Sequence, residues 1–332
     1  MNAPKVDELD YINFLIAAQR VFSTVEVAKV SPDEMRQPAH DAYTRLLQRT
    51  PPDSNMALWR EVDPLVKRKS DVLMVDDSTL DKPYARHMAL LTRHWSGKHH
   101  QVVQGINLVS LVWSDGEARL PCDFRLHNKD QDGLSKNDHF QHMIAQAHER
   151  GFEPEVVALD SWYASLPNIK LIRDYHWHWL TQLKSNRQVS VDRSGNRAIS
   201  GLIIPVNGLI VHLKGYAWIK VFRTVGTNGN PEYWATNQLD MTIQQAADYA
   251  LDAWQIEVYH RGLKQFTGIE RGQFRLEIAQ GNHIGFAIRA FVRLEAHRLQ
   301  RQLSYFESKT DIIRDVIRAY LAHPTLVLQP TA

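Results

Sequence analysis

A short apolar run that ends in two carboxylates constrains most strongly what this chain can fold into. Residues 71–82 read DVLMVDDSTLDK, and the run 72–75 is continuous, apolar and rich in β-branched residues. Such a run predicts a strand that is covered on both faces, so Asp76 and Asp77 would lie where the strand reaches the surface. Carboxylates held there by a rigid element can bind a hard cation. An Asp-Asp-Ser sequence also starts ordinary turns, so this run alone leaves both interpretations open.

Length and composition indicate an ordinary globular protein. The 332 residues are 44% hydrophobic and 23% charged, which is close to the average for soluble proteins and leaves room for two domains of usual size. No run of about 20 apolar residues would span a bilayer, and the amino terminus carries no signal segment, so we expect a cytoplasmic protein without a membrane partner. Cys122 is the only cysteine, which excludes an intramolecular disulfide and a multi-cysteine zinc site.

The net charge of +2 gives no argument for a nucleic-acid partner, but the distribution of charge is more informative. Between residues 258 and 301, eight basic side chains stand against three acidic ones. Such a local excess suits a polyanion, and Arg271 and Arg275 belong to it. A solvated helix face gives similar counts, so this segment alone does not decide the matter.

Residues 1–66 show the apolar spacing of short helices, broken at prolines. The portion 23–47 has a suitable length for a helix-turn-helix. On its second helix, the candidate recognition residues are Asp41, Tyr43, Thr44 and Arg45. We therefore expect a helical DNA-binding region, with a plain helical bundle as the alternative.

The chain after the first strand predicts a known order of elements. The expected strands are 102–113, 119–126, 156–159 and 177–183, and the expected helices are 136–150 and 165–174. This is the order of a ribonuclease H-like core, which is a mixed five-stranded sheet flanked by helices. Its first and fourth strands are neighbours, and the fourth expected strand ends in Asp160. Asp76 or Asp77 would then approach Asp160, and a divalent cation would relieve the repulsion between the two carboxylates.

Residues 186–240 change in character, because short apolar runs at 202–204, 209–211 and 219–222 alternate with turns rich in Gly and Asn. We interpret this segment as a β-rich insertion. The ribonuclease H-like catalytic domain would consist of residues 67–185 and 241–332, including C-terminal helices.

A helical pattern runs from Thr242 through Gln265 and carries Glu257 in its middle. His260, Arg261 and Lys264 follow Glu257 at three, four and seven positions, so all four share one helix face. The carboxylate of Glu257 can complete a metal site, and the basic side chains beside it can hold phosphate. A surface Glu-Arg pair is the alternative.

Two motifs resemble those of the DDE transposases of bacterial insertion sequences, particularly the cut-and-paste group with a β insertion before the catalytic Glu. LDSWYAS at 159–165 is similar to the motif around the second Asp of that family, and WQIEVYHRGLK at 254–264 is similar to its Glu-bearing helix. One departure is that Ala250 and Ala253 stand where the family carries a Tyr and an Arg. This places the hairpin-forming route of the family in doubt.

The resemblance implies Mg²⁺-dependent cleavage at transposon ends and transfer of the freed 3′-hydroxyl into target DNA, performed by a homodimer at the nucleoid. The implied catalytic residues are Asp76, Asp77, Asp160 and Glu257. Asp76, Asp160 and Glu257 would bind Mg²⁺, or Mn²⁺ in its place, although Asp77 also fits the motif. The implied DNA contacts are His260, Arg261, Lys264, Arg271, Arg275 and Trp218. Trp218 or Trp234 would stack a displaced base, with core packing as the alternative. A ribonuclease H-like nuclease or resolvase without strand transfer and an inactive DNA-binding relic are the competing functions.

Overall fold

The apolar run after Asp71 forms an inner strand of a large mixed sheet. In the computed structural model, which describes residues 4–32, 37–50, 54–96, 101–128, 131–226 and 229–324, this strand is β1 (Val72–Asp81). β1 pairs antiparallel with β3 (Gln101–Ser114) and parallel with β5 (Val156–Leu159). Its first four residues are buried, as expected for a continuous apolar run with a partner strand on each side.

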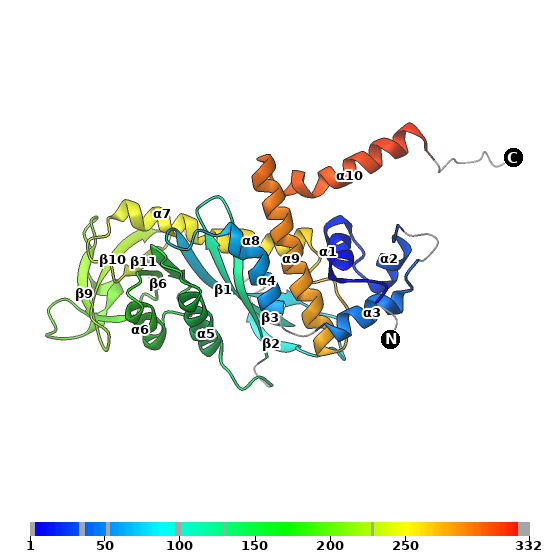
Figure 1. The fold of residues 1–332 in the computed structure, drawn as a ribbon. Helices are drawn as coiled ribbons and strands as arrows, with labels where there is room; N and C mark the ends of the chain where they lie inside the picture. Colours follow the sequence, from blue (N-terminus) through cyan, green and yellow to red (C-terminus); the bar gives the residue numbers. More distant parts are fainter. Residues whose placement is uncertain are drawn as a thin grey trace. The chain divides into compact units, whose positions relative to one another are not determined.

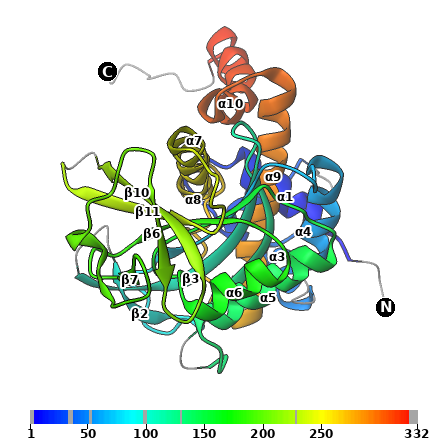
Figure 2. The ribbon, with the colours of Figure 1, turned by 90° about the vertical axis from the view of Figure 1, so that its left-hand side faces the viewer.

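Five strands reproduce the predicted core. β3 also pairs with β4 (Leu120–His127), and β5 pairs in parallel with β6 (Trp179–Leu183), so the order is β4-β3-β1-β5-β6. Helices α5 (Lys136–Glu149) and α6 (Leu166–Asp174) cover one face of this sheet, and α7 (Ile243–Ala253) covers the other (Figures 1 and 2). The predicted fold class, a mixed α/β sheet flanked by helices, is confirmed.

The sheet continues beyond the five core strands. β11 (Pro231–Thr236) pairs antiparallel with β6, and the strand order then runs through β10, β9, β7 and β8. The bounds of these strands are Trp218–Val225 for β10, Leu209–Leu213 for β9, Gln188–Ser190 for β7 and Arg197–Ala198 for β8. The segment interpreted as an insertion therefore extends the core sheet by backbone hydrogen bonds.

Two local predictions were wrong. Residues 202–204 form no strand; a 3-10 turn, η2 (Ile199–Gly201), precedes them, and Pro205, which lacks an N–H group, follows. Ile203 is 94% exposed, and Leu202 and Ile204 are only partly buried. Conversely, the expected strands did not include β2 (Thr92–Ser96), which pairs with β3; residues 97–100 lie outside the described residues.

Contacts group the described residues into two units. The first unit comprises the described residues within 55–84 and 90–260. It contains the whole sheet, the turn η1 (Asp63–Leu65) and all of helix α4 (Ser54–Val62) except its first residue. The other comprises those within 1–54, 85–89 and 261–332 and is helical. Its helices are α1 (Glu8–Ala17), α2 (Thr24–Lys29), α3 (His40–Arg49), α9 (Glu277–Arg301) and α10 (Tyr305–Ala322). The three-part division of the chain predicted above stays a prediction.

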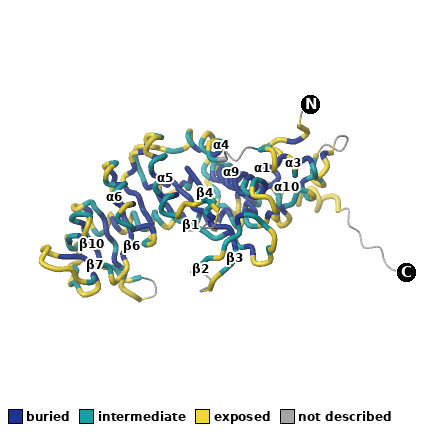
Figure 3. The backbone as a smooth tube through the Cα atoms, turned by 90° about the horizontal axis from the view of Figure 1, so that it is seen from below, coloured by how far each residue is buried: buried dark blue, intermediate teal, exposed yellow. Residues whose placement is uncertain are grey.

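Helix α9 forms the core of the helical unit and is buried along most of its length (Figure 3). The hydroxyl of Tyr11 on α1 lies 3.0 Å from Nδ1 of His283, and the amide of Asn282 donates to the Leu47 carbonyl at the end of α3. Tyr43 is buried, so this candidate recognition residue belongs to the core instead. Within the residues that the structure describes, no helix is both long and apolar enough to cross a membrane.

Candidate active site

The register between β1 and β5 brings two of the predicted acids together. The parallel ladder pairs Val72 with Val156 and ends with Val75 opposite Leu159. Asp76 and Asp160 are the next residues on each strand, so they stand at the same level of the sheet. β1 itself continues to Asp81, paired with β3. The two adjacent acids therefore lie inside a strand, at the point where its β5 partner ends, and not at the strand end predicted from the sequence.

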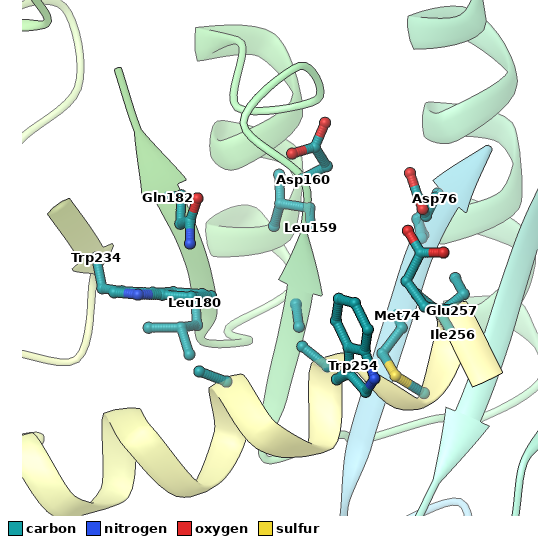
Figure 4. Close-up of a pocket in the computed structure, with 14 residues that line it drawn as sticks. Met74, Asp76, Leu159, Asp160, Leu180, Gln182, Trp234, Trp254, Ile256 and Glu257 are labelled. Atoms are coloured by element: carbon teal, nitrogen blue, oxygen red, sulfur yellow. The ribbon is translucent and has the colours of Figure 1, made fainter. Parts of the chain in front are cut away.

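Asp76, Asp160 and Glu257 line one pocket of about 250 Å³ (Figure 4). Figure 4 shows the carboxylates of Asp76 and Glu257 side by side, with Asp160 at the end of the neighbouring strand. The walls come from β1, β5, β6, β11 and residues 250–257. The remaining lining residues are largely apolar and include Met74, Leu180, Gln182, Trp234 and Trp254.

Asp76 is the acid of the pocket whose surroundings oppose ionisation. Its side chain is 20% exposed, and burial together with the charges of Asp77, Glu257 and Asp160 raises the pKa of Asp76 well above its usual range. Asp160 is exposed, and its Oδ1 accepts a hydrogen bond of 2.6 Å from the Ser161 N–H. Mutual repulsion among acids that share a pocket is the usual condition for attracting a cation.

Glu257 owes its position to a break in the predicted helix. Residues 242–265 do not form one helix, because α7 ends at Ala253 and α8 (Gln255–Phe266) begins after Trp254. Glu257 thus lies in the first turn of α8 and not in mid-helix, and its N–H donates to the Trp254 carbonyl. A carboxylate is favoured in this turn by the partial positive charge of a helix N-terminus.

Asp77 points to the other face of β1, because successive side chains of a strand alternate. Its Oδ2 accepts hydrogen bonds from the Asn107 amide at 2.8 Å and the Lys136 ammonium at 2.7 Å, and its Oδ1 accepts one from the Tyr163 hydroxyl at 3.0 Å. Burial opposes ionisation here, but the charge and hydrogen bond of Lys136, with the other two donors, lower the pKa of Asp77. Three donors hold this carboxylate, and it does not line the pocket.

The comparison of sequences then decides the family. Residues 9–195 match the model of a family described as DDE superfamily endonuclease. This match covers more than half of the chain and contains both Asp76 and Asp160. The chain belongs to the DDE superfamily endonucleases. No curated protein sequence matches this DDE endonuclease significantly.

Solved structures resemble the fold of the DDE endonuclease. The piggyBac transposase in a synaptic complex with hairpin DNA is 12% identical, with a TM-score of 0.53, over 98% of this chain and 76% of that chain. A Drosophila P element transposase in a strand transfer complex is 9% identical, with a TM-score of 0.30, over 98% of this chain and 88% of that chain. The first similarity extends to the fold alone, and the second is too low to support an argument. The predicted family and enzyme class are confirmed by the sequence match.

The predicted DNA-contact residues of the DDE endonuclease differ in exposure and in their partners. His260 is 4% exposed, and its Nδ1 lies 4.0 Å from Oδ2 of Asp76. Arg261, Arg271 and Arg275 are exposed, whereas Lys264 pairs with Glu270 at 3.0 Å. Trp218 does not line the pocket; its ring contacts His212, and the guanidinium of Arg193 lies 5.2 Å from its ring centre. The structure thus brings the three acids and His260 together within the sheet unit.

Sequence reasoning did not identify the residues that hold Asp77. Lys136 begins α5 and also lies 5.4 Å from the ring centre of Trp162, while Tyr163 stacks on Phe140. Tyr163 belongs to the recognised LDSWYAS motif, so a signal for it was present. Asn107 lies within the apolar strand β3, and no pattern distinguished it.

The donor set fits the divalent metal ion on which DDE endonucleases depend. Three carboxylates from β1, β5 and α8 face one pocket, and hard cations such as Mg²⁺ prefer oxygen ligands. Burial and the neighbouring acids raise the pKa of Asp76, so the protein alone disfavours its ionised form. A cation would favour that form.

Proposed function

We propose that this DDE endonuclease is a transposase that cleaves DNA at the ends of a mobile element and joins the freed 3′-hydroxyl to target DNA. Asp76, Asp160 and Glu257 would hold Mg²⁺, or Mn²⁺ in its place. The observation that carries the proposal is that these three carboxylates, from β1, β5 and α8, line one pocket although 181 positions separate the first from the last.

In the first reaction, the oxygen of a water molecule attacks a phosphodiester at the element end and the bond from phosphorus to the 3′ oxygen breaks. The leaving 3′ oxygen takes up one proton and becomes a hydroxyl, and the other proton of the water is released to solvent from the new 5′-phosphate. In the second, that 3′-hydroxyl oxygen attacks a target phosphodiester and displaces another 3′ oxygen. When bound, divalent metal stabilises the charge that develops on phosphate and activates the attacking oxygen.

The protein contributes rigid placement of the acids. The Ser161 N–H fixes one oxygen of Asp160, and the hydrogen bonds on Asp77 fix the strand that carries Asp76. We propose that His260 is a positioning residue for Asp76 and does not contact DNA, because its ring is buried beside that carboxylate.

DNA contacts are proposed for the exposed cations Arg261, Arg271 and Arg275, which suit phosphate groups. The Lys264 ammonium, already paired with Glu270, would contribute less. For base stacking we prefer Trp234 to Trp218, since Trp234 lines the pocket. The helical region 1–66 would recognise the element ends at the nucleoid.

A second candidate function is a nuclease of the same core without strand transfer. Ala250 and Ala253 line the pocket at the two positions where the resembling transposases carry Tyr and Arg. The nearby Tyr249 donates to Glu155 at 2.8 Å and is engaged there. These residues leave one wall of the pocket without the phosphate-binding groups of that family.

Strand transfer separates the two functions. A short duplex with a recessed 3′-hydroxyl at a candidate element end is incubated with the enzyme, Mg²⁺ and a supercoiled target plasmid. Covalent joining of the labelled duplex to the plasmid is the expected result. Nicking of DNA without joined product would favour the nuclease, and the absence of any metal-dependent cleavage would favour an inactive relic.

A homodimer on DNA is proposed because two element ends must be held together, as in the synaptic complex of the piggyBac transposase. Helix α10 presents an exposed apolar face that suits a second copy, with Val316 67%, Ile317 50% and Leu321 68% exposed. Arg314 with Asp311 and Arg318 with Asp315 give this helix both signs of charge, so it is self-complementary.

The variant with Ile317→Glu and Leu321→Glu is expected to be monomeric on end DNA, because it places charges in the apolar face. The wild-type complex is expected to be dimeric when its mass is measured by light scattering. Ala322→Glu, an exposed position that lies about 100° or more around the helix from Val316, Ile317 and Leu321, is the matched control and should remain dimeric. A wild-type complex that is strictly monomeric would contradict the proposal.

A further inference from the structure

Three side chains outside the active site form a second group of metal-ligand type. His127 lies at the end of β4, Asp132 lies in the following connection, and His139 lies one turn into α5. His127 Nδ1 is 3.3 Å and His139 Nε2 is 3.0 Å from the same oxygen, Oδ2 of Asp132. The two imidazole rings meet edge to face at 5.5 Å. All three ligand atoms lie within 4.8 Å of one another.

The backbone holds this group in place. The N–H of Asn128 donates to Oδ2 of Asp132 at 3.0 Å, and the N–H of Leu134 donates to its Oδ1 at 3.2 Å. The side chains of His127 and His139 are only 11% and 8% exposed, so packing limits their rotation. A carboxylate and two imidazoles are therefore arranged before any ligand arrives.

The spacing fits a transition metal. Nitrogen and oxygen ligands that lie about 2.0–2.1 Å from a tetrahedral Zn²⁺ ion stand about 3.3 Å from each other. The His127 distance of 3.3 Å equals this value, and the His139 distance of 3.0 Å is slightly shorter. Imidazole nitrogens select Zn²⁺, Co²⁺ and related ions, in contrast to the all-oxygen set of Asp76, Asp160 and Glu257, which suits Mg²⁺. In the metal-free protein both imidazoles form hydrogen bonds with Asp132, and a bound ion would replace the protons of these bonds.

We propose that His127, Asp132 and His139 bind a transition metal ion of the Zn²⁺ class, separate from the catalytic metal. The fourth position is left for water. The ion joins the end of β4 to the first turns of α5. Because Lys136 stands one turn before His139 on α5 and holds Asp77, this metal anchors the helix that supports β1 beside the active site.

Cobalt provides a test on the full-length protein. Metal-free protein titrated with Co²⁺ is expected to develop the visible absorption bands of a four-coordinate ion with a stoichiometry of one. Zn²⁺ should abolish these bands and raise the melting temperature by several degrees at about 100 times its Kd. His139→Gln and, separately, His127→Gln should remove the bands and the metal-dependent shift.

Two further variants control the result. His142→Gln replaces an exposed histidine on α5 and should titrate like the wild type. Asp160→Asn should retain the cobalt bands, which locates them away from the catalytic acids. If His139→Gln does not fold, His127→Gln decides. The proposal is overturned if wild type shows no stoichiometric band, or if both glutamine variants bind cobalt and respond to Zn²⁺ as the wild type does.

Discussion

Replacement of Asp160 with Asn is expected to lower metal-dependent DNA cleavage by about a thousandfold or more, with little change in DNA affinity. The substitution removes one of three charges that face the metal position. The amide oxygen of Asn can still accept the Ser161 N–H bond that Asp160 Oδ1 accepts at 2.6 Å, so the local fold should survive. Nicking of supercoiled plasmid in Mg²⁺ measures the first effect, and a gel-shift titration with end DNA measures the second.

Asp174→Asn is the matched control for this experiment. Asp174 is also an exposed aspartate, but it ends α6 and pairs only with Arg173 among the described residues. Its replacement should leave both cleavage and DNA binding at wild-type levels. Full cleavage by Asp160→Asn in Mg²⁺ would remove Asp160 from the catalytic set.

Asp76→Asn and Asp77→Asn are expected to have opposite effects. Asp76→Asn should abolish cleavage and leave the free energy of unfolding of the metal-free protein unchanged or higher, because burial and the neighbouring acids disfavour the charged form of Asp76. Asp77→Asn should lower that free energy by about 1–3 kcal/mol, since the Lys136 ammonium, itself about 20% exposed, loses its partner. Some cleavage should remain. Urea unfolding at pH 7 and plasmid nicking together measure both properties.

The reverse result would reassign the metal ligand. If Asp77→Asn is stable and inactive while Asp76→Asn cleaves DNA, then Asp77 faces the metal. Asn107→Ala is the control for stability alone, because it removes one of the donors to Asp77 without touching a carboxylate.

The sequence was sufficient for elements with strong apolar patterns. β3, β4, β5 and α5 lie close to their expected bounds, because each is a continuous or periodic run with clear ends. β1 begins at Val72 as expected but continues to Asp81, six residues beyond its apolar run. The pairing of Val75 with Leu159 could be anticipated only through the order of elements. The choice between Asp76 and Asp77 could not be made, because it depends on which face of β1 turns toward Asp160.

Other features depend on contacts that are distant in sequence. Strand β2 is polar, and its pairing with β3 forms it. No proline or glycine near Trp254 marks the break between α7 and α8 in the sequence. The cluster of His127, Asp132 and His139 has no recognised ligand spacing, and it assembles only when β4 and α5 pack. Asn107 and Lys136 meet Asp77 in the same way, across the fold.

The pairing of β11 with β6 has a consequence for solubility and for engineering. If residues 186–240 were excised to obtain a minimal catalytic core, β6 would become a free edge with unpaired N–H and C=O groups, ready to add strands from other molecules. In the intact chain the strand order at this side ends at β8, which has only two residues and offers little template for aggregation. A shortened protein is therefore expected to precipitate, whatever the state of its catalytic acids.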